Sequence, residues 1–139
     1  IGVLEYEEDI MCECVNCGQH ARDKHHCVFR SKVKALTKCP KNIVNLCGDC
    51  HYDIHHKSKS NIDIKMKLRF QNYLEESWLK NELTYKEIKD TLKISDANVH
   101  RILKTCTLKN GCYQREDVIR ECMGGRLYTL EDLNRGEKV

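Results

Sequence analysis

Two short stretches, Cys14-Val-Asn-Cys17 and Cys47-Gly-Asp-Cys50, decide the fold of the first part of this chain. In each stretch two residues separate the cysteines, so a tight turn brings both thiolates to one metal ion. Two such pairs together predict one tetrahedral zinc site with four sulfur ligands. Four cysteines complete such a site, yet the chain also places histidines between the pairs and directly after them. These histidines indicate a second, functional metal beside a structural one.

The composition is typical of small domains that a metal ion helps to stabilise. The chain has 139 residues, of which 32% are charged and only 6% are aromatic. One or two domains with modest apolar cores would form, and a structural zinc would add to their stability. Ten cysteines could instead form the disulfides of a secreted protein. The CxxC spacing, the absence of a signal peptide and the many lysines favour a reducing compartment. We therefore expect a cytoplasmic location, in a bacterium or a phage-infected host cell.

The net charge of +3 says little by itself about a partner. Basic residues cluster after the second cysteine pair, at Lys57, Lys59, Lys65, Lys67 and Arg69. A charge run is usually a solvated face, but next to a candidate metal site it favours contact with phosphates. No apolar run approaches the length of a membrane span, so we expect a soluble protein with no membrane partner.

The chain divides into three predicted regions. Residues 1–60 carry the cysteines and histidines described above, residues 61–82 form a helical connector, and residues 83–139 form a second domain. In the connector, apolar residues recur at helical spacing: Ile62, Met66, Phe70, Tyr73, Leu74 and Trp78. This stripe predicts a helix over residues 62–80 that packs on the first domain or on a second copy of the chain.

The third region has the pattern of a helix-turn-helix. Thr84 and Glu87 form a capping box, which predicts that a helix begins there. A turn follows, and Ser95 caps a second helix with its apolar residues facing inward. The outward side chains of this second helix can touch bases and phosphates, and they are Asp96, Asn98, His100, Arg101 and Lys104. Among them we take Asn98, Arg101 and Lys104 as candidate DNA contacts.

The rest of this region agrees with a DNA-binding domain. Asn110-Gly111 predicts a two-residue turn in a small wing hairpin. Further helices are expected to begin near Arg115 and after Thr129. The run from residue 85 to residue 123 resembles the small helix-turn-helix domains of the excisionase and MerR type, in which a wing and a helix follow the recognition helix. A helical hairpin that serves only for packing is the alternative.

The histidines near the cysteine pairs have the spacing that metal chemistry needs. His25 and His26 lie in a strand-like stretch, so their side chains point to opposite sides. His51 and His55 lie one helical turn apart, directly after the second pair. A strand histidine and a helix histidine can converge on one divalent ion with open positions, as metal-assisted phosphodiester hydrolysis requires. The remaining histidine can take a proton from water.

The order of these motifs resembles that of the HNH endonucleases, in the version with four zinc-binding cysteines. The matching elements are the first cysteine pair, His25-His26, Asn45 and Cys47-x-x-Cys50-His51. The resemblance covers residues 12 to 56, about a third of the chain. It implies an α+β fold, in which a small zinc-stabilised ββα-metal nuclease domain precedes a mostly helical helix-turn-helix domain.

The resemblance also implies a role for each matching residue. His26 is the expected general base, and His25 and His51 are the expected ligands of a catalytic Mg²⁺ or Mn²⁺ ion. His55 is a third ligand or a phosphate contact. Asn45 corresponds to the middle Asn, whose side chain orients the loop and the base. The structural zinc would be held by Cys14, Cys17, Cys47 and Cys50.

These expectations combine into one function. The chain would hydrolyse phosphodiester bonds of double-stranded DNA, leaving a 5′-phosphate and a 3′-hydroxyl, as a monomer or homodimer. The helix-turn-helix would give site preference, as in homing or phage-type nucleases. Arg30 would hold a phosphate, or it is an ordinary surface residue. The alternatives are a non-catalytic zinc-containing DNA-binding regulator and a dimeric HNH restriction endonuclease. A second zinc on Cys12, Cys27 or Cys39 is also open.

Overall fold

The computed structural model describes residues 12–57 and 61–136, so Lys59 of the basic cluster lies outside it. The described chain combines helices with two small antiparallel sheets, in agreement with the expected α+β class. The elements are β1 (Asp23–His26), η1 (Lys34–Leu36), η2 (Pro40–Asn42), β2 (Ile43–Leu46), α2 (Gly48–His56), α3 (Ile62–Ser77), β3 (Glu82–Leu83), α4 (Tyr85–Leu92), α5 (Asp96–Leu103), β4 (Tyr113–Gln114), α6 (Arg115–Cys122) and α7 (Leu130–Gly136).

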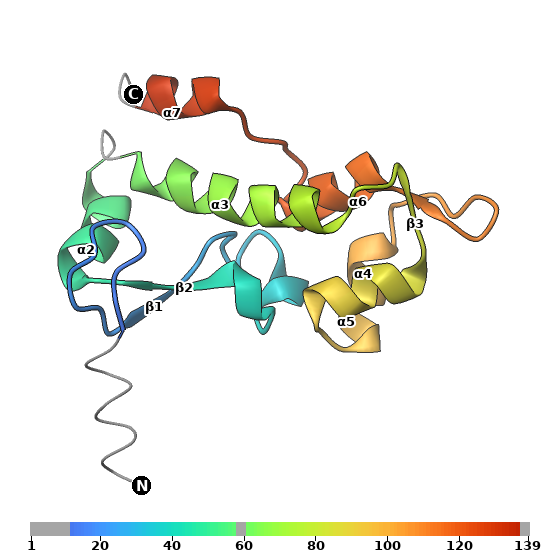
Figure 1. Ribbon diagram of the computed structural model, residues 1–139, viewed down its shortest axis with the longest axis horizontal. Helices are drawn as coiled ribbons and strands as arrows, with labels where there is room; N and C mark the ends of the chain where they lie inside the picture. The colour runs from blue at the N-terminus through green and yellow to red at the C-terminus, as the bar shows by residue number, and fades with distance from the viewer. Residues whose placement is uncertain (1–11, 58–60, 137–139) are drawn as a thin grey trace, which may run out of the picture.

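A strand–strand–helix unit occupies one end of the molecule (Figure 1). Strand β1 pairs antiparallel with β2, with His25 opposite Val44. Helix α2 begins directly after β2 because Cys47 caps it: its sulfur accepts a hydrogen bond from the backbone N–H of Cys50, at 3.4 Å. This cap turns the chain sharply, so that α2 packs back against β1. The unit thereby brings histidines of β1 and α2 together.

The loop between β1 and β2 runs through the two short 3₁₀ helices η1 and η2. Asn42, which is fully buried, holds this loop together. Its amide nitrogen donates to the carbonyl oxygens of Val28 and Leu36, and its side-chain oxygen accepts from the N–H of Val28 at 2.8 Å. The buried N–H and carbonyl of Val28 depend on Asn42 for their hydrogen bonds, whereas the Leu36 carbonyl also accepts from the N–H of Cys39.

Helix α3 extends along the molecule from α2 toward the C-terminal helices (Figure 1). The predicted apolar stripe is present, with Phe70 and Leu74 fully buried, but the helix ends at Ser77, where Trp78 caps it, and not at residue 80 as predicted. The Trp78 indole donates a hydrogen bond to the hydroxyl of Thr91, at 2.9 Å, which joins α3 to α4. Buried side chains from Cys14 to Met123 form one continuous apolar cluster. The two ends of the described chain therefore share a core.

The predicted helices of the C-terminal part are present. Helix α4 begins with the capping box of Thr84 and Glu87, and Ser95 caps α5. The turn between them contains Lys93 in the left-handed conformation, at φ 54°. Asn110 and Gly111 form the expected tight turn with positive φ angles, 53° and 77°. Beyond this turn, β4 pairs with β3, which precedes α4. No helix in the described ranges is long and apolar enough to cross a bilayer.

Candidate metal centres

The four cysteines of the two CxxC pairs meet at one point. Their sulfur atoms all lie within 4.8 Å of one another, and the residues are Cys14, Cys17, Cys47 and Cys50. The Cys17 and Cys47 sulfurs are 3.6 Å apart. A tetrahedral zinc with Zn–S distances of about 2.3 Å separates its sulfurs by about 3.8 Å. The cluster therefore has the size of a structural zinc site, as the sequence predicted.

The protonation chemistry of these thiols also fits a cation. Burial raises the pKa of Cys14, but neighbouring backbone groups, first that of Cys47, lower it to a net value of about 6. The pKa of Cys50 is raised to about 12, chiefly by burial, although the Asn16 side chain donates to its sulfur at 3.3 Å. Four thiolates at this separation repel one another, and a divalent cation removes that penalty. The donor set thus suits Zn²⁺.

This cluster fixes the position of α2. The first pair lies in a tight turn, in which the N–H of Gly18 donates to the carbonyl of Cys14 at 2.9 Å. The N–H of Val15 in the same turn donates to the carbonyl of Asn45 in β2, at 3.0 Å. Because Cys47 and Cys50 belong to the start of α2, a shared ion would tie the turn, the sheet and the helix together.

Three histidines converge in a second cluster. One ring nitrogen each of His25, His51 and His55 lies within 4.8 Å of the other two. His25 comes from β1, and the other two come from successive turns of α2. They line an open hollow of about 470 Å³ together with His26 and Arg30. The structure thus places a strand histidine beside two helix histidines, where the sequence predicted that one of each could converge.

Asp23 orients one of these ligands, and the sequence analysis did not identify it. The Nδ1 atom of His51 lies 3.2 Å from the Asp23 carboxylate, to which its N–H donates. The other nitrogen, Nε2, then carries the lone pair that a metal ion needs. Asp23 lies two residues before His25 in β1, so both point to the same face of the strand. That spacing was a usable sequence signal.

His25 is the buried member of the cluster, with 5% of its surface exposed. Its Nε2 atom is buried and has no hydrogen-bond partner among the described residues. Burial, with a smaller contribution from the neighbouring His51, lowers the pKa of His25 to about 4. The ring is therefore neutral at physiological pH. A buried imidazole nitrogen without a partner is costly, and a metal ion would satisfy the ring. The cluster thus fits a divalent ion.

His26 lines the same hollow but has a different partner. Its Nε2 atom lies 2.9 Å from the backbone carbonyl oxygen of Thr37. A carbonyl oxygen can only accept, so Nε2 of His26 carries the hydrogen. In the neutral ring this leaves Nδ1 unprotonated and able to accept a proton. The geometry supplies the tautomer that a general base requires.

The side-chain hydrogen bonds that hold the β1–β2 loop come from Asn42, while the orienting role expected of Asn45 stays a prediction. Asn45 is half-buried in β2, and its backbone carbonyl binds Val15. Within the described chain its side chain makes no hydrogen bond to the loop or to His26. Asn42 instead holds the carbonyl of Leu36, the residue before Thr37, which binds the His26 ring. Asn42 and Asn45 lie only three residues apart in the sequence. Their different burial and hydrogen bonds become visible only in the folded structure.

The candidate DNA contacts fall into two places. Arg30 is exposed and lines the histidine hollow. Asn98 and Arg101 lie on α5 and line a separate hollow, and Arg101 donates to the side-chain oxygen of Asn98 at 3.2 Å. Lys104 is exposed at the end of α5. The structure thus does not bring the α5 residues into the histidine site.

Comparisons with known proteins do not add a family to this description. No family model matches the chain, and no curated protein or solved structure gives a match either. The functional conclusion therefore rests on the geometry of the two ligand clusters.

Proposed function

We propose that this protein is a metal-dependent endonuclease of the HNH type that hydrolyses phosphodiester bonds in double-stranded DNA. The observation that carries the proposal is the histidine hollow. Three imidazoles converge there on one point, and a fourth, His26, lines the same hollow in the tautomer of a base. The four-cysteine cluster lies on the same strand–strand–helix unit. It would hold a structural Zn²⁺ that fixes the position of α2, and with it the positions of His51 and His55 relative to β1.

The mechanism follows from the positions of the side chains. His26 accepts the proton of a water molecule on Nδ1, and the water oxygen forms a bond to phosphorus while the bond to the 3′-oxygen breaks. His25, His51 and His55 would hold the divalent ion, which would supply positive charge to stabilise the phosphoryl oxygens and the leaving oxygen. The 3′-oxygen takes a proton from solvent. Arg30 binds a phosphate at the edge of the hollow. The products carry a 5′-phosphate and a 3′-hydroxyl.

The donor set bears on the identity of the catalytic ion. Magnesium and manganese were expected from the resemblance, but Mg²⁺ prefers oxygen ligands. Three imidazole nitrogens instead favour zinc, nickel, copper or iron, and Asp23, the carboxylate bound to His51, is already engaged. We infer that a transition metal supports the reaction better than Mg²⁺. Site preference would come from the C-terminal helices, as the resemblance to phage and homing nucleases implies.

Cleavage of supercoiled plasmid tests the proposal. The purified protein should nick or linearise DNA with a divalent transition metal, and EDTA should stop the reaction. His26→Ala should abolish cleavage while the zinc content and circular dichroism stay unchanged. His56→Ala is the matched control, because His56 is exposed at the end of α2 and does not line the hollow.

Unchanged cutting by His26→Ala would refute the role of His26. Binding without cutting under every metal would favour the zinc-containing regulator, and sedimentation would show whether a dimeric restriction-type enzyme is formed.

A further inference from the structure

Two of the four described residues of the predicted basic cluster after the second cysteine pair are already engaged, whereas Lys65 and Arg69 are exposed on α3 and make no salt bridge in the described part of the chain. Lys67 in that cluster is buried, is ion-paired with Asp63 and lies 4.4 Å from the ring centre of Phe29. Lys57 pairs with Asp53 at 3.4 Å. Neither ammonium group is therefore an unoccupied phosphate contact.

A different stretch carries unpaired positive charge. Between Asp23 and Asp49 the chain has no acidic residue, but it has six basic ones. All six are exposed, and they are Lys24, Arg30, Lys32, Lys34, Lys38 and Lys41. In the described part of the chain, none of them makes a salt bridge. Most of them belong to the loop between β1 and β2.

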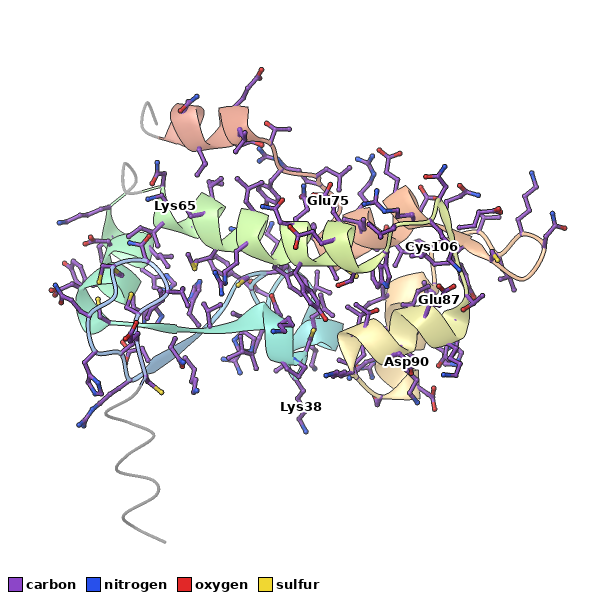
Figure 2. All side chains as sticks on the ribbon, viewed as in Figure 1. Lys38, Lys65, Glu75, Glu87, Asp90 and Cys106 are labelled. Carbon is purple, nitrogen blue, oxygen red and sulfur yellow. The ribbon has the colours of Figure 1, made fainter. Side chains whose placement is uncertain are left out.

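This loop meets the C-terminal helices at a second hollow. Helix α5 contacts η1, and a hollow of about 380 Å³ lies at this junction. Lys34 and Lys38 line it from the loop, Lys93 lines it from the turn before α5, and Arg101 lines it from α5 itself. Figure 2 shows Lys38 pointing away from α3 on the side where α5 lies. We call this hollow the basic cleft, after its four basic residues.

The lining of the basic cleft contains no acidic side chain; its other members are Thr37, Ile94, Ser95 and Asn98. Folding therefore gathers four cations from the loop, the turn before α5 and α5 itself, and Glu121 is an acid on the adjoining hollow that Lys34 and Arg101 also line. Their mutual repulsion disfavours the arrangement unless an anion binds there. The spacing of several cations along a groove, rather than one tight pocket, suits a polyanion with repeated phosphates.

The state of Arg101 and Asn98 agrees with phosphate binding. The Arg101 guanidinium donates to the Asn98 side-chain oxygen, which is the atom that would accept from an adenine amino group. Because the Asn98 oxygen already accepts from Arg101, the two side chains offer only their remaining N–H groups to a ligand. Donors alone match phosphate oxygens, and they do not match an adenine edge, which offers a donor as well as an acceptor.

We propose that the basic cleft binds the phosphate backbone of duplex DNA, so that the loop of the metal unit and helix α5 hold one duplex together. The choice of DNA rests on the proposed function. A third hollow connects the basic cleft with the histidine hollow along the chain. Ser31 lines the histidine hollow, and the next residue, Lys32, lines the third hollow. Lys34 and Arg101 of the basic cleft line this third hollow as well. Glu121 is the acid on that intermediate hollow. Arg101 is accordingly an anchor on phosphate and not a reader of bases.

Equilibrium binding of the full-length protein to three unrelated 20-base-pair duplexes, without a divalent metal, tests this proposal. Lys34→Ala/Lys38→Ala and Arg101→Ala should each weaken binding equally on all three sequences, by on the order of 5–10-fold per cation at 0.1 M salt. The slope of log K against log salt should fall by about 1 for each cation removed. Arg120→Ala is the control, since it removes the same charge from α6 outside the cleft. Lys34→Gln/Lys38→Gln provides a second pair if the alanine variant folds poorly.

Three results would overturn the proposal. The first is unchanged affinity in the cleft variants, and the second is an equal loss in Arg120→Ala, which would show a general charge effect. The third is a loss in Arg101→Ala that depends on sequence, which would make this residue a base reader. Failure of the proposed function is seen separately, because wild-type protein would then bind these duplexes without cutting plasmid under any metal.

Discussion

The Nδ1 atom of His51 lies 3.2 Å from a carboxylate oxygen of Asp23, although 28 positions separate the two residues. The contact joins the start of β1 to the first half of α2, across the face on which His25 also lies. It selects one tautomer of His51 and leaves Nε2 as the metal-binding atom. The orientation of the candidate ligand thus depends on a residue outside the cluster.

Replacing Asp23 should therefore weaken metal binding. We expect Asp23→Ala to lower the affinity of the histidine site for its ion about 10- to 100-fold, with most of the cleavage rate restored at saturating metal. Titration of cleavage with Mn²⁺ or Ni²⁺ measures both quantities. Asp23→Asn keeps a side-chain acceptor for the His51 N–H and should retain more affinity than the alanine variant. Equal metal affinity in all three proteins would show that Asp23 does not position His51.

The choice of metal should follow from the donor atoms. His55 is the most exposed of the three candidate ligands, so a substitution there disturbs packing least. We expect His55→Asp to raise the activity with Mg²⁺ or Mn²⁺ relative to Ni²⁺ or Zn²⁺, because a carboxylate is the harder ligand. Cleavage rates across these four metals give the ratio. A ratio that does not change would mean that His55 is not a ligand and contacts DNA instead.

Much of the metal unit could be predicted because its constraints are local. A CxxC spacing, a capping box and an Asn-Gly turn each act within a few residues, and the structure contains all three. The roles of Asp23 and Asn42 depend on which distant groups surround them after folding. Lys67 shows the same limit, since its burial against Phe29 cannot be read from a basic run. Local patterns therefore identified the residues of the two candidate metal clusters, and packing identified the residues that contact them and their loop.

Removing zinc should unfold the metal unit before the C-terminal helices. Cys47→Ala deletes a sulfur ligand and also the cap of α2, so we expect the loss of one equivalent of zinc and of the β1–α2 contacts. Mass spectrometry under native conditions counts the metal, and hydrogen exchange locates the loss of structure. Cys112→Ser is the control, because this half-buried thiol lies in the hairpin outside the cluster. Retention of full zinc by Cys47→Ala would refute the four-cysteine site.

The last prediction concerns the different roles of Asn42 and Asn45. Asn42→Ala removes three hydrogen bonds from the β1–β2 loop and leaves the buried N–H and carbonyl of Val28 unpaired, while the Leu36 carbonyl keeps only its bond from the Cys39 N–H. We expect a loss of about 2–4 kcal/mol in the free energy of unfolding, since each unsatisfied buried group costs about 1–3 kcal/mol. Chemical denaturation measures this loss.

The same change should lower the rate of cleavage at temperatures where the variant is still folded. The carbonyl of Thr37, which holds the His26 ring, follows Leu36, so a loosened loop releases the base from its tautomer and orientation. Metal affinity should change little, because the side-chain hydrogen bonds of Asn42 go to Val28 and Leu36 and not to His25, His51 or His55 in the described structure. Asn45→Ala is the matched comparison in β2, and it should leave both stability and rate close to those of the wild type. If Asn45→Ala reduces the rate while Asn42→Ala does not, the middle asparagine of the resemblance is Asn45 after all, and the side-chain bonds of Asn42 serve only to stabilise the loop.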